Sequence, residues 1–155
     1  TNSSLMDGLT VGVGYGETSY DMAAGNADQI DTTSTTGFFT YSLGAVTVGY
    51  QSSYTSGSVG TVSSVGNRTI GANEVTNMGI AFNVNDAFSI SYQDYDNEYL
   101  KRGDQGDVTQ NIDGIQAAYT MGGATLRISD VSVTNGGGTT GNSEDRTEVS
   151  LLMAF

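Results

Sequence analysis

The clearest indication of the fold is the stretch Tyr41-Ser-Leu-Gly-Ala-Val-Thr-Val-Gly-Tyr50. On either side of Gly44-Ala45, apolar residues alternate with small or polar ones, so that every second side chain would lie on the same face of a strand. Two residues between two such runs make a connection of β-hairpin length. We therefore predict two antiparallel strands, of which the first ends at Leu43 and the second begins at Val46.

The same alternation continues outward from this hairpin in both directions, whereas helical spacing is hard to find. It predicts eight strands, at residues 9–16, 36–43, 46–54, 77–83, 88–93, 115–121, 125–129 and 148–155. The connections alternate in length: they are short at 44–45, 84–87 and 122–123, and long and polar at 16–32, 55–74, 96–111 and 134–144. In an up-and-down antiparallel sheet, all short turns then lie at one end and all long loops at the other.

Length and composition exclude several classes of function. With 155 residues the chain allows one ordinary domain, and we treat residues 1–155 as a single domain. Five basic against 17 acidic residues give a net charge of −12, which argues against binding nucleic acid. Cys and His are both absent, which removes disulfides, thiolate metal sites and the commonest general base. We therefore expect no enzyme; an outer-membrane hydrolase would usually need a Ser-His pair.

The unequal connections are typical of transmembrane β-barrels, which have short turns at one end and long loops at the other. Alternation alone does not decide this, because a soluble barrel has the same period. The membrane is favoured because the apolar faces carry no Lys or Arg and the opposite faces are mostly Thr, Ser, Gln, Asn and Gly. Aromatic residues near the short turns predict an interfacial girdle of Tyr41, Phe82, Phe88, Tyr119 and Phe155.

Several segments of the sequence resemble the Gram-negative general porins, and most of all their alphaproteobacterial, Rhodobacter-type branch. They are Gly8-Leu-Thr-Val-Gly-Val-Gly-Tyr15, the hairpin quoted above, and Ala118-Tyr-Thr-Met-Gly-Gly-Ala-Thr-Leu126. The last apolar residues of the chain are similar to the C-terminal signal that outer-membrane assembly machinery reads: Val149, Leu151, Met153 and Phe155. Porins of this family have sixteen strands, so this chain would supply about eight of them.

The resemblance implies a passive, water-filled channel for small hydrophilic solutes and ions in the outer membrane of a Gram-negative bacterium. It implies a homotrimer of the full-length protein, contacts with the lipid bilayer and lipopolysaccharide, and insertion by the outer-membrane assembly machinery. A constriction loop folded inside the channel would belong to the N-terminal half and be absent here. The predicted fold class is thus all-β, an antiparallel up-and-down transmembrane β-barrel of which residues 1–155 form the C-terminal part.

The beginning of the chain agrees with this interpretation. Met6-Asp7-Gly8 has the character of another short turn, so residues 1–5 would end a preceding strand. Residues 1–4 carry neither positive charge nor an apolar run, so we expect that a signal peptide has been removed or that the N-terminus lies upstream. We therefore expect an upstream coding sequence. The alternative is a complete eight-stranded outer-membrane barrel with a structural or adhesive role, although small, Gly-rich inward residues would fill its interior poorly. A soluble β-domain is a further alternative.

The candidate pore-lining residues are those that fall on the polar faces of the predicted strands: Arg127, Arg146, Glu148, Gln51, Gln93 and Gln116. A charge on the lipid face near mid-bilayer would cost roughly 2–4 kcal/mol, whereas a lumen charge stays hydrated and tunes ion selectivity. Alternatively, Arg146 and Glu148 lie at the loop end, outside the membrane. Asp113 and Asp130 fall at the alternate positions that apolar residues occupy in the same strands. We therefore expect them above the bilayer or beyond a β-bulge.

Two motifs point to ligands only weakly. Residues 136–141 match GxGxxG, but a dinucleotide site needs a following helix and here a strand follows. Asp94-Tyr-Asp-Asn-Glu98 begins like a calcium loop, but Tyr99 and Gln105 stand where that loop needs Gly and Glu. We expect no cofactor beyond loose Ca²⁺ or Mg²⁺ binding by acids of the long connections: Asp94, Asp96, Glu98, Asp104 and Asp107. The excess of acids in those connections also predicts an electronegative outer mouth that favours cations.

Overall fold

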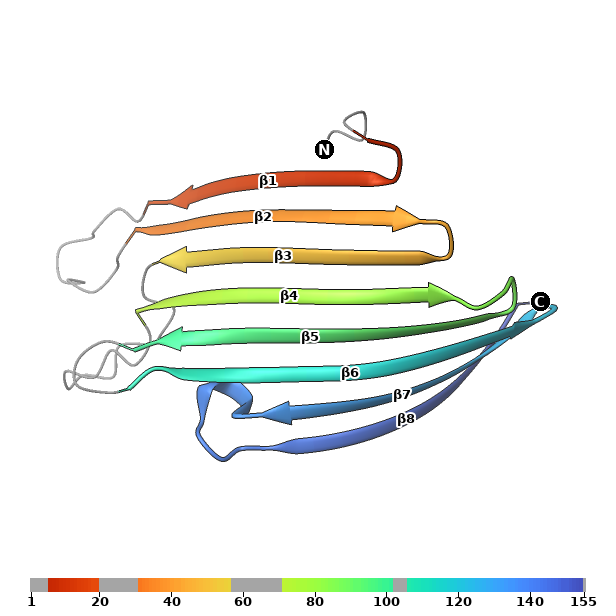
Figure 1. The fold of residues 1–155 in the computed structure, drawn as a ribbon. Coiled ribbons are helices and arrows are strands. Elements are labelled where there is room, and N and C mark those ends of the chain that lie inside the picture. Colours follow the sequence, from red (N-terminus) through yellow and green to blue (C-terminus); the bar gives the residue numbers. More distant parts are fainter. Residues whose placement is uncertain (1–5, 20–30, 57–70, 102–105, 155) are drawn as a thin grey trace.

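The computed structural model describes residues 6–19, 31–56, 71–101 and 106–154, which form one open antiparallel sheet (Figure 1). Its eight strands lie side by side in chain order: β1 Leu9–Thr18, β2 Thr32–Leu43, β3 Val46–Ser56, β4 Ala72–Asn83, β5 Phe88–Leu100, β6 Val108–Met121, β7 Ala124–Thr134 and β8 Glu144–Met153. A 3-10 turn, η1, at Gly136–Gly138 lies in the connection between β7 and β8. Within these ranges, no helix is long and apolar enough to cross a membrane.

The number, order and direction of the predicted strands are confirmed, but the predicted long connection at 96–111 is wrong. β5 continues to Leu100 and β6 begins at Val108, so Asp94, Asp96 and Glu98 lie in a strand. The backbone ladder continues through these acids because β5 has strands on both sides, with Leu100 opposite Ala72 and Tyr99 opposite Val108. Backbone hydrogen bonding to two neighbours therefore outweighs the polar sequence that suggested a loop.

Short turns join the strands at one end of the sheet, as predicted. Gly44 (φ +58°) and Gly122 (φ +59°) adopt the left-handed conformation that tight hairpin turns require. In the β4–β5 turn, the Asn85 side-chain oxygen accepts hydrogen bonds from the backbone N–H groups of Ala87 and Phe88, both at 2.9 Å. The turn expected at 6–8 is also present, closed by a 3.1 Å backbone hydrogen bond from Leu9 to Met6.

The strands pair residue by residue without interruption, so one face of the sheet can be followed from edge to edge. Val48 lies opposite Tyr41 and Ile80, Ile80 opposite Tyr92, and Tyr92 opposite Ile115. The pairing also runs one to one through Asp113 and Asp130. The β-bulge considered for these two acids is therefore absent, and they share the face of the apolar residues.

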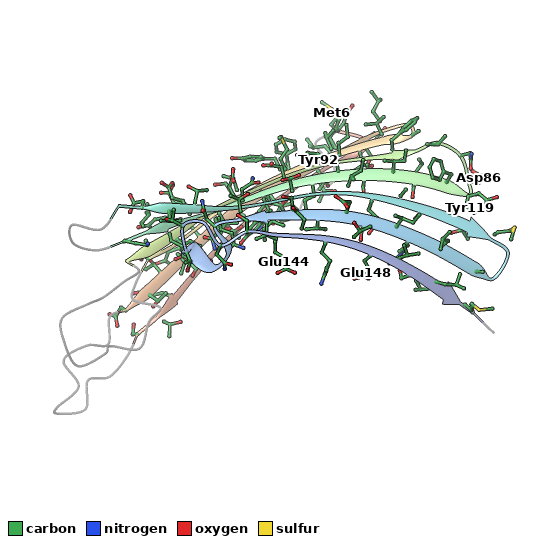
Figure 2. All side chains as sticks on the ribbon, turned by 90° about the horizontal axis from the view of Figure 1, so that it is seen from below. Met6, Asp86, Tyr92, Tyr119, Glu144 and Glu148 are labelled. Atoms are coloured by element: carbon green, nitrogen blue, oxygen red, sulfur yellow. The ribbon has the colours of Figure 1, made fainter. Side chains whose placement is uncertain are left out.

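The sheet is a single curved layer, and it buries almost nothing. Of the described residues, only Ala72 and Asn97 are buried, at 7% and 8% exposure. Figure 2 shows the curvature, with Tyr92 on the convex side and Glu148 on the concave side. A sheet with an apolar face normally covers that face with a second layer. Here both faces of the described sheet are open.

Candidate functional site

The convex face is apolar, and it is the most distinctive surface of the molecule. Nineteen exposed large hydrophobic side chains lie in the described strands, and 18 of them project from this one face; Leu152 is the exception. Exposure reaches 94% at Val13 and 65% at Val149. No Lys or Arg lies on this face in the described strands. Soluble monomers rarely expose an apolar surface of this extent.

The predicted aromatic girdle lies on the convex face, near the short turns. Tyr41 and Tyr119 each lie two residues before the end of their strand, Phe82 lies next to the end of β4, and Phe88 begins β5 directly opposite Tyr119. Phe155 lies outside the described residues. One aromatic contact that the sequence did not predict lies deeper in this face, where the ring centroids of Phe39 and Tyr50 are 6.1 Å apart.

The candidate assembly signal lies on the outermost strand. Val149, Leu151 and Met153 project from the convex face of β8 with 57–65% exposure. β8 pairs with β7 on one side, and its other edge has no neighbouring strand among the described residues. Phe155, the last member of the predicted signal, lies outside the described residues.

An acidic zone borders the apolar part of the convex face on the side of the long loops. In β5, Tyr92 is followed on the convex face by Asp94, and Asp94 lies directly opposite Asp113. Asn111 donates hydrogen bonds to Asp94 and Asp96, and the Thr147 hydroxyl donates to Asp130 over 2.6 Å. These carboxylates thus accept hydrogen bonds at the border of the apolar side chains, since Asp94 also lies opposite Met78 and Asp130 opposite Ile115.

The apolar band has unequal height across the sheet. It runs over residues 9–15 in β1 but only over 88–92 in β5. At about 3.3 Å per residue, these stretches are roughly 20 Å and 13 Å long. Transmembrane barrels have apolar bands about 25 Å tall. The band is equally short over residues 78–82 of β4 and 124–128 of β7, and on β5 the acidic zone follows it directly.

The concave face is hollowed, and small and polar side chains line most of the hollow, together with Phe38, Ile112 and Val131. Its hollow has a volume of about 560 Å³ and spans β2 to β7, and the three predicted glutamines Gln51, Gln93 and Gln116 all line it. Short side chains along this face bond to one another across strands, as in the hydroxyl pair of Ser42 and Thr47 at 2.9 Å. The structure therefore brings the predicted glutamines together on one surface that is open to solvent.

The predicted charged pore residues share the concave face, but they lie outside the lining of this hollow. Arg127 is opposite Ala118 and Ser150, toward the short-turn end. Arg146 and Glu148 form an ion pair with a 3.8 Å separation, and their side chains are 66% and 57% exposed. Such an exposed pair contributes at most about 1 kcal/mol to stability. Its role here is to place opposite charges on the polar surface near the edge of the sheet.

The candidate cation-binding acids do not form a site in the described part of the chain, where no three His, Cys, Asp or Glu residues are grouped to hold a metal ion. Asp94, Asp96 and Glu98 follow one another at alternate positions of β5. Asp107 instead accepts a 2.8 Å hydrogen bond from the backbone N–H of Lys101. Asp104 lies outside the described residues.

The sequence did not predict the fold of the β7–β8 loop, residues 135–143. The loop turns back over the concave face, where the Asn135 side chain donates to the backbone oxygen of Thr109 and the Gly137 N–H donates to Gln110 Oε1. The Tyr99 hydroxyl donates to the same Gln110 oxygen over 2.9 Å. The Gly-rich run indicated a loop correctly, but its partners lie 26 and 27 residues away in the sequence.

Comparison with known proteins adds no relative: no family model, no curated protein and no solved structure matches this chain.

Proposed function

We propose that this sheet is part of the wall of an outer-membrane porin, a passive water-filled channel for small hydrophilic solutes and ions. The observation that supports this most strongly is the one-sided exposure: 18 of 19 exposed large hydrophobic strand residues lie on the convex face. In a barrel wall the convex face is the outer one. Hydrocarbon is the solvent in which an uncovered apolar outer face is stable.

The concave face supports the same proposal. Its amide and hydroxyl groups can hydrogen-bond to water, and its Gly and Ser residues leave space above the backbone. Conduction through such a wall needs no catalytic residue, because polar side chains line the water and fixed charges bias the ions. Gln51, Gln93 and Gln116 would line the channel, and Arg127, Arg146 and Glu148 would influence its ion selectivity.

The remaining features of the proposal follow from the resemblance to general porins. The protein would lie in the outer membrane of a Gram-negative bacterium, in contact with lipopolysaccharide, and would assemble as a homotrimer. This chain would form the C-terminal part of a larger barrel. Val149, Leu151 and Met153 on β8 would belong to the segment that the assembly machinery reads.

One observation favours a second candidate, a soluble β-domain whose convex face packs against protein. The apolar band over residues 88–92 of β5 is only about 13 Å long. Asp94 and Asp113 follow directly on the same face. A protein layer covering the apolar band would leave these acids exposed to water at the edge of the interface. The two candidates differ in whether lipid or protein contacts Ile80 and Ile115.

Liposome swelling tests the proposed channel. The protein expressed from its complete coding sequence should make liposomes permeable to small sugars, with rates that fall as the sugar becomes larger. The rates for D- and L-arabinose should be equal, because a water-filled channel does not bind one stereoisomer. Swelling no faster than in protein-free liposomes would contradict the proposal.

A further inference from the structure

We propose that the β7–β8 loop, residues 135–143, is a fixed cover over the long-loop end of the concave face, and that it limits the size of solutes that enter. The anchor is the pair Tyr99 and Gln110, whose side chains meet beneath the loop. The sieving role rests on the proposed channel function. The anchoring itself is a property of the fold and is tested separately.

The loop is closed on itself, so it can keep one shape. Its two ends are joined by backbone bonding, with the Gly136 N–H donating to the Asn142 oxygen over 2.7 Å. The Asn142 side chain donates back to the Gly136 oxygen over 3.0 Å. Asn135, in the left-handed conformation, accepts from the Gly141 N–H with its side-chain oxygen. These bonds leave little freedom for the residues between them.

The loop is also tied to two other strands at three points. Asn135 donates to the Thr109 backbone oxygen over 3.0 Å, and the Gly137 N–H donates to Gln110 Oε1 over 3.1 Å. Gly138 lies against the Tyr99 ring so closely that an added Cβ would be 2.8 Å from a ring carbon. Gly138 has φ +71°, which disfavours any side chain there. Glycine is therefore required at this position for contact with Tyr99.

The β7–β8 loop covers the concave face, because the residues that it contacts project from that face. Tyr99 and Gln110 project from the same face as Gln93 and Gln116, two residues that line the hollow. Figure 1 shows the loop turning from the end of β7 back toward β6. The loop therefore lies over the concave face beyond the hollow, on its long-loop side. In a channel wall this position is at the outer mouth, where a fixed segment reduces the open cross-section.

The anchor is tested with Gln110→Ala, which removes the acceptor shared by Tyr99 and Gly137. Thr109→Ala is the matched control, since it alters the neighbouring side chain on the opposite face and keeps the backbone oxygen that binds Asn135. In the protein from its complete coding sequence, reconstituted in detergent, hydrogen exchange of amides 136–142 should be about five- to tenfold faster in Gln110→Ala, as expected for loss of one net hydrogen bond. It should be unchanged in Thr109→Ala. Equal exchange in Gln110→Ala and the native chain would overturn the anchor.

The sieving role is tested by liposome swelling with the protein from the complete coding sequence. The ratio of swelling in a trisaccharide to swelling in arabinose should rise in Gln110→Ala and in Gly138→Val, which removes the contact with Tyr99 by a different route. Faster loop exchange with an unchanged ratio would overturn the sieve and leave the anchor supported. No swelling in the native protein would overturn both the channel and the sieve, whereas the exchange result would still decide the anchor.

Discussion

Placed alone in a planar bilayer, the 155-residue chain is expected to give no steady single-channel current. The described sheet ends at β1 and β8, strands of 10 residues each, and neither has a neighbour at its outer edge. Each unpaired backbone group costs several kcal/mol in hydrocarbon. Closing the eight strands on themselves would pair these groups, but it would narrow the lumen until the concave side chains displaced free water.

The control for this experiment is the protein expressed from its complete coding sequence, which should produce steady conductance steps under the same conditions. Stable conductance steps from the chain alone would contradict the expectation. They would favour the alternative of a complete eight-stranded outer-membrane barrel.

The second large effect is expected from a charge placed on the convex face. Ile80 lies near the middle of that face, 48% exposed and directly between Val48 and Tyr92. If lipid covers it, Ile80→Lys should lower the free energy of unfolding in lipid vesicles by about 2–4 kcal/mol. The measurement is urea-induced unfolding of the protein from its complete coding sequence, reconstituted into vesicles.

Ala81→Lys provides the matched control, since Ala81 is the next residue of β4 and projects from the opposite, concave face between Thr47 and Ser91. A lysine there stays hydrated, so the change in the free energy of unfolding should remain within about 0.5 kcal/mol. Equal destabilisation by both substitutions would argue against a lipid-facing convex side.

The sequence was sufficient to predict the number and order of the strands because alternation, turn residues and connection lengths all agree. Residues around Gly44 and Gly122 show this: both hairpins follow from two-residue connections between alternating runs, and both glycines have positive φ. The predicted gathering of the apolar residues on one face is also confirmed, because the uninterrupted pairing places the alternate positions of all eight strands on the same side of the sheet. Contact of that face with lipid stays a prediction.

The features that the sequence did not predict depend on contacts between distant residues. The strand character of Asp96 and Glu98 comes from pairing with β4 and β6, which outweighs their low strand preference. The fold of the β7–β8 loop depends on Gln110 and Tyr99, and nothing in the run of glycines at 136–138 specifies those partners. Local patterns determine the order of the strands and which face is apolar, whereas they do not determine how far a paired strand extends or where a glycine-rich loop packs.

The central claim is that the convex face contacts lipid and the concave face contacts water. The chain has no Cys, so a single cysteine can carry a fluorescent label at Ile115, on the convex face, or at Gln116, on the concave face. With the protein from its complete coding sequence in vesicles, the Ile115→Cys label should be quenched by brominated acyl chains and protected from aqueous iodide. The Gln116→Cys label should show the reverse. Quenching of the Ile115→Cys label by iodide but not by brominated lipid would contradict the account.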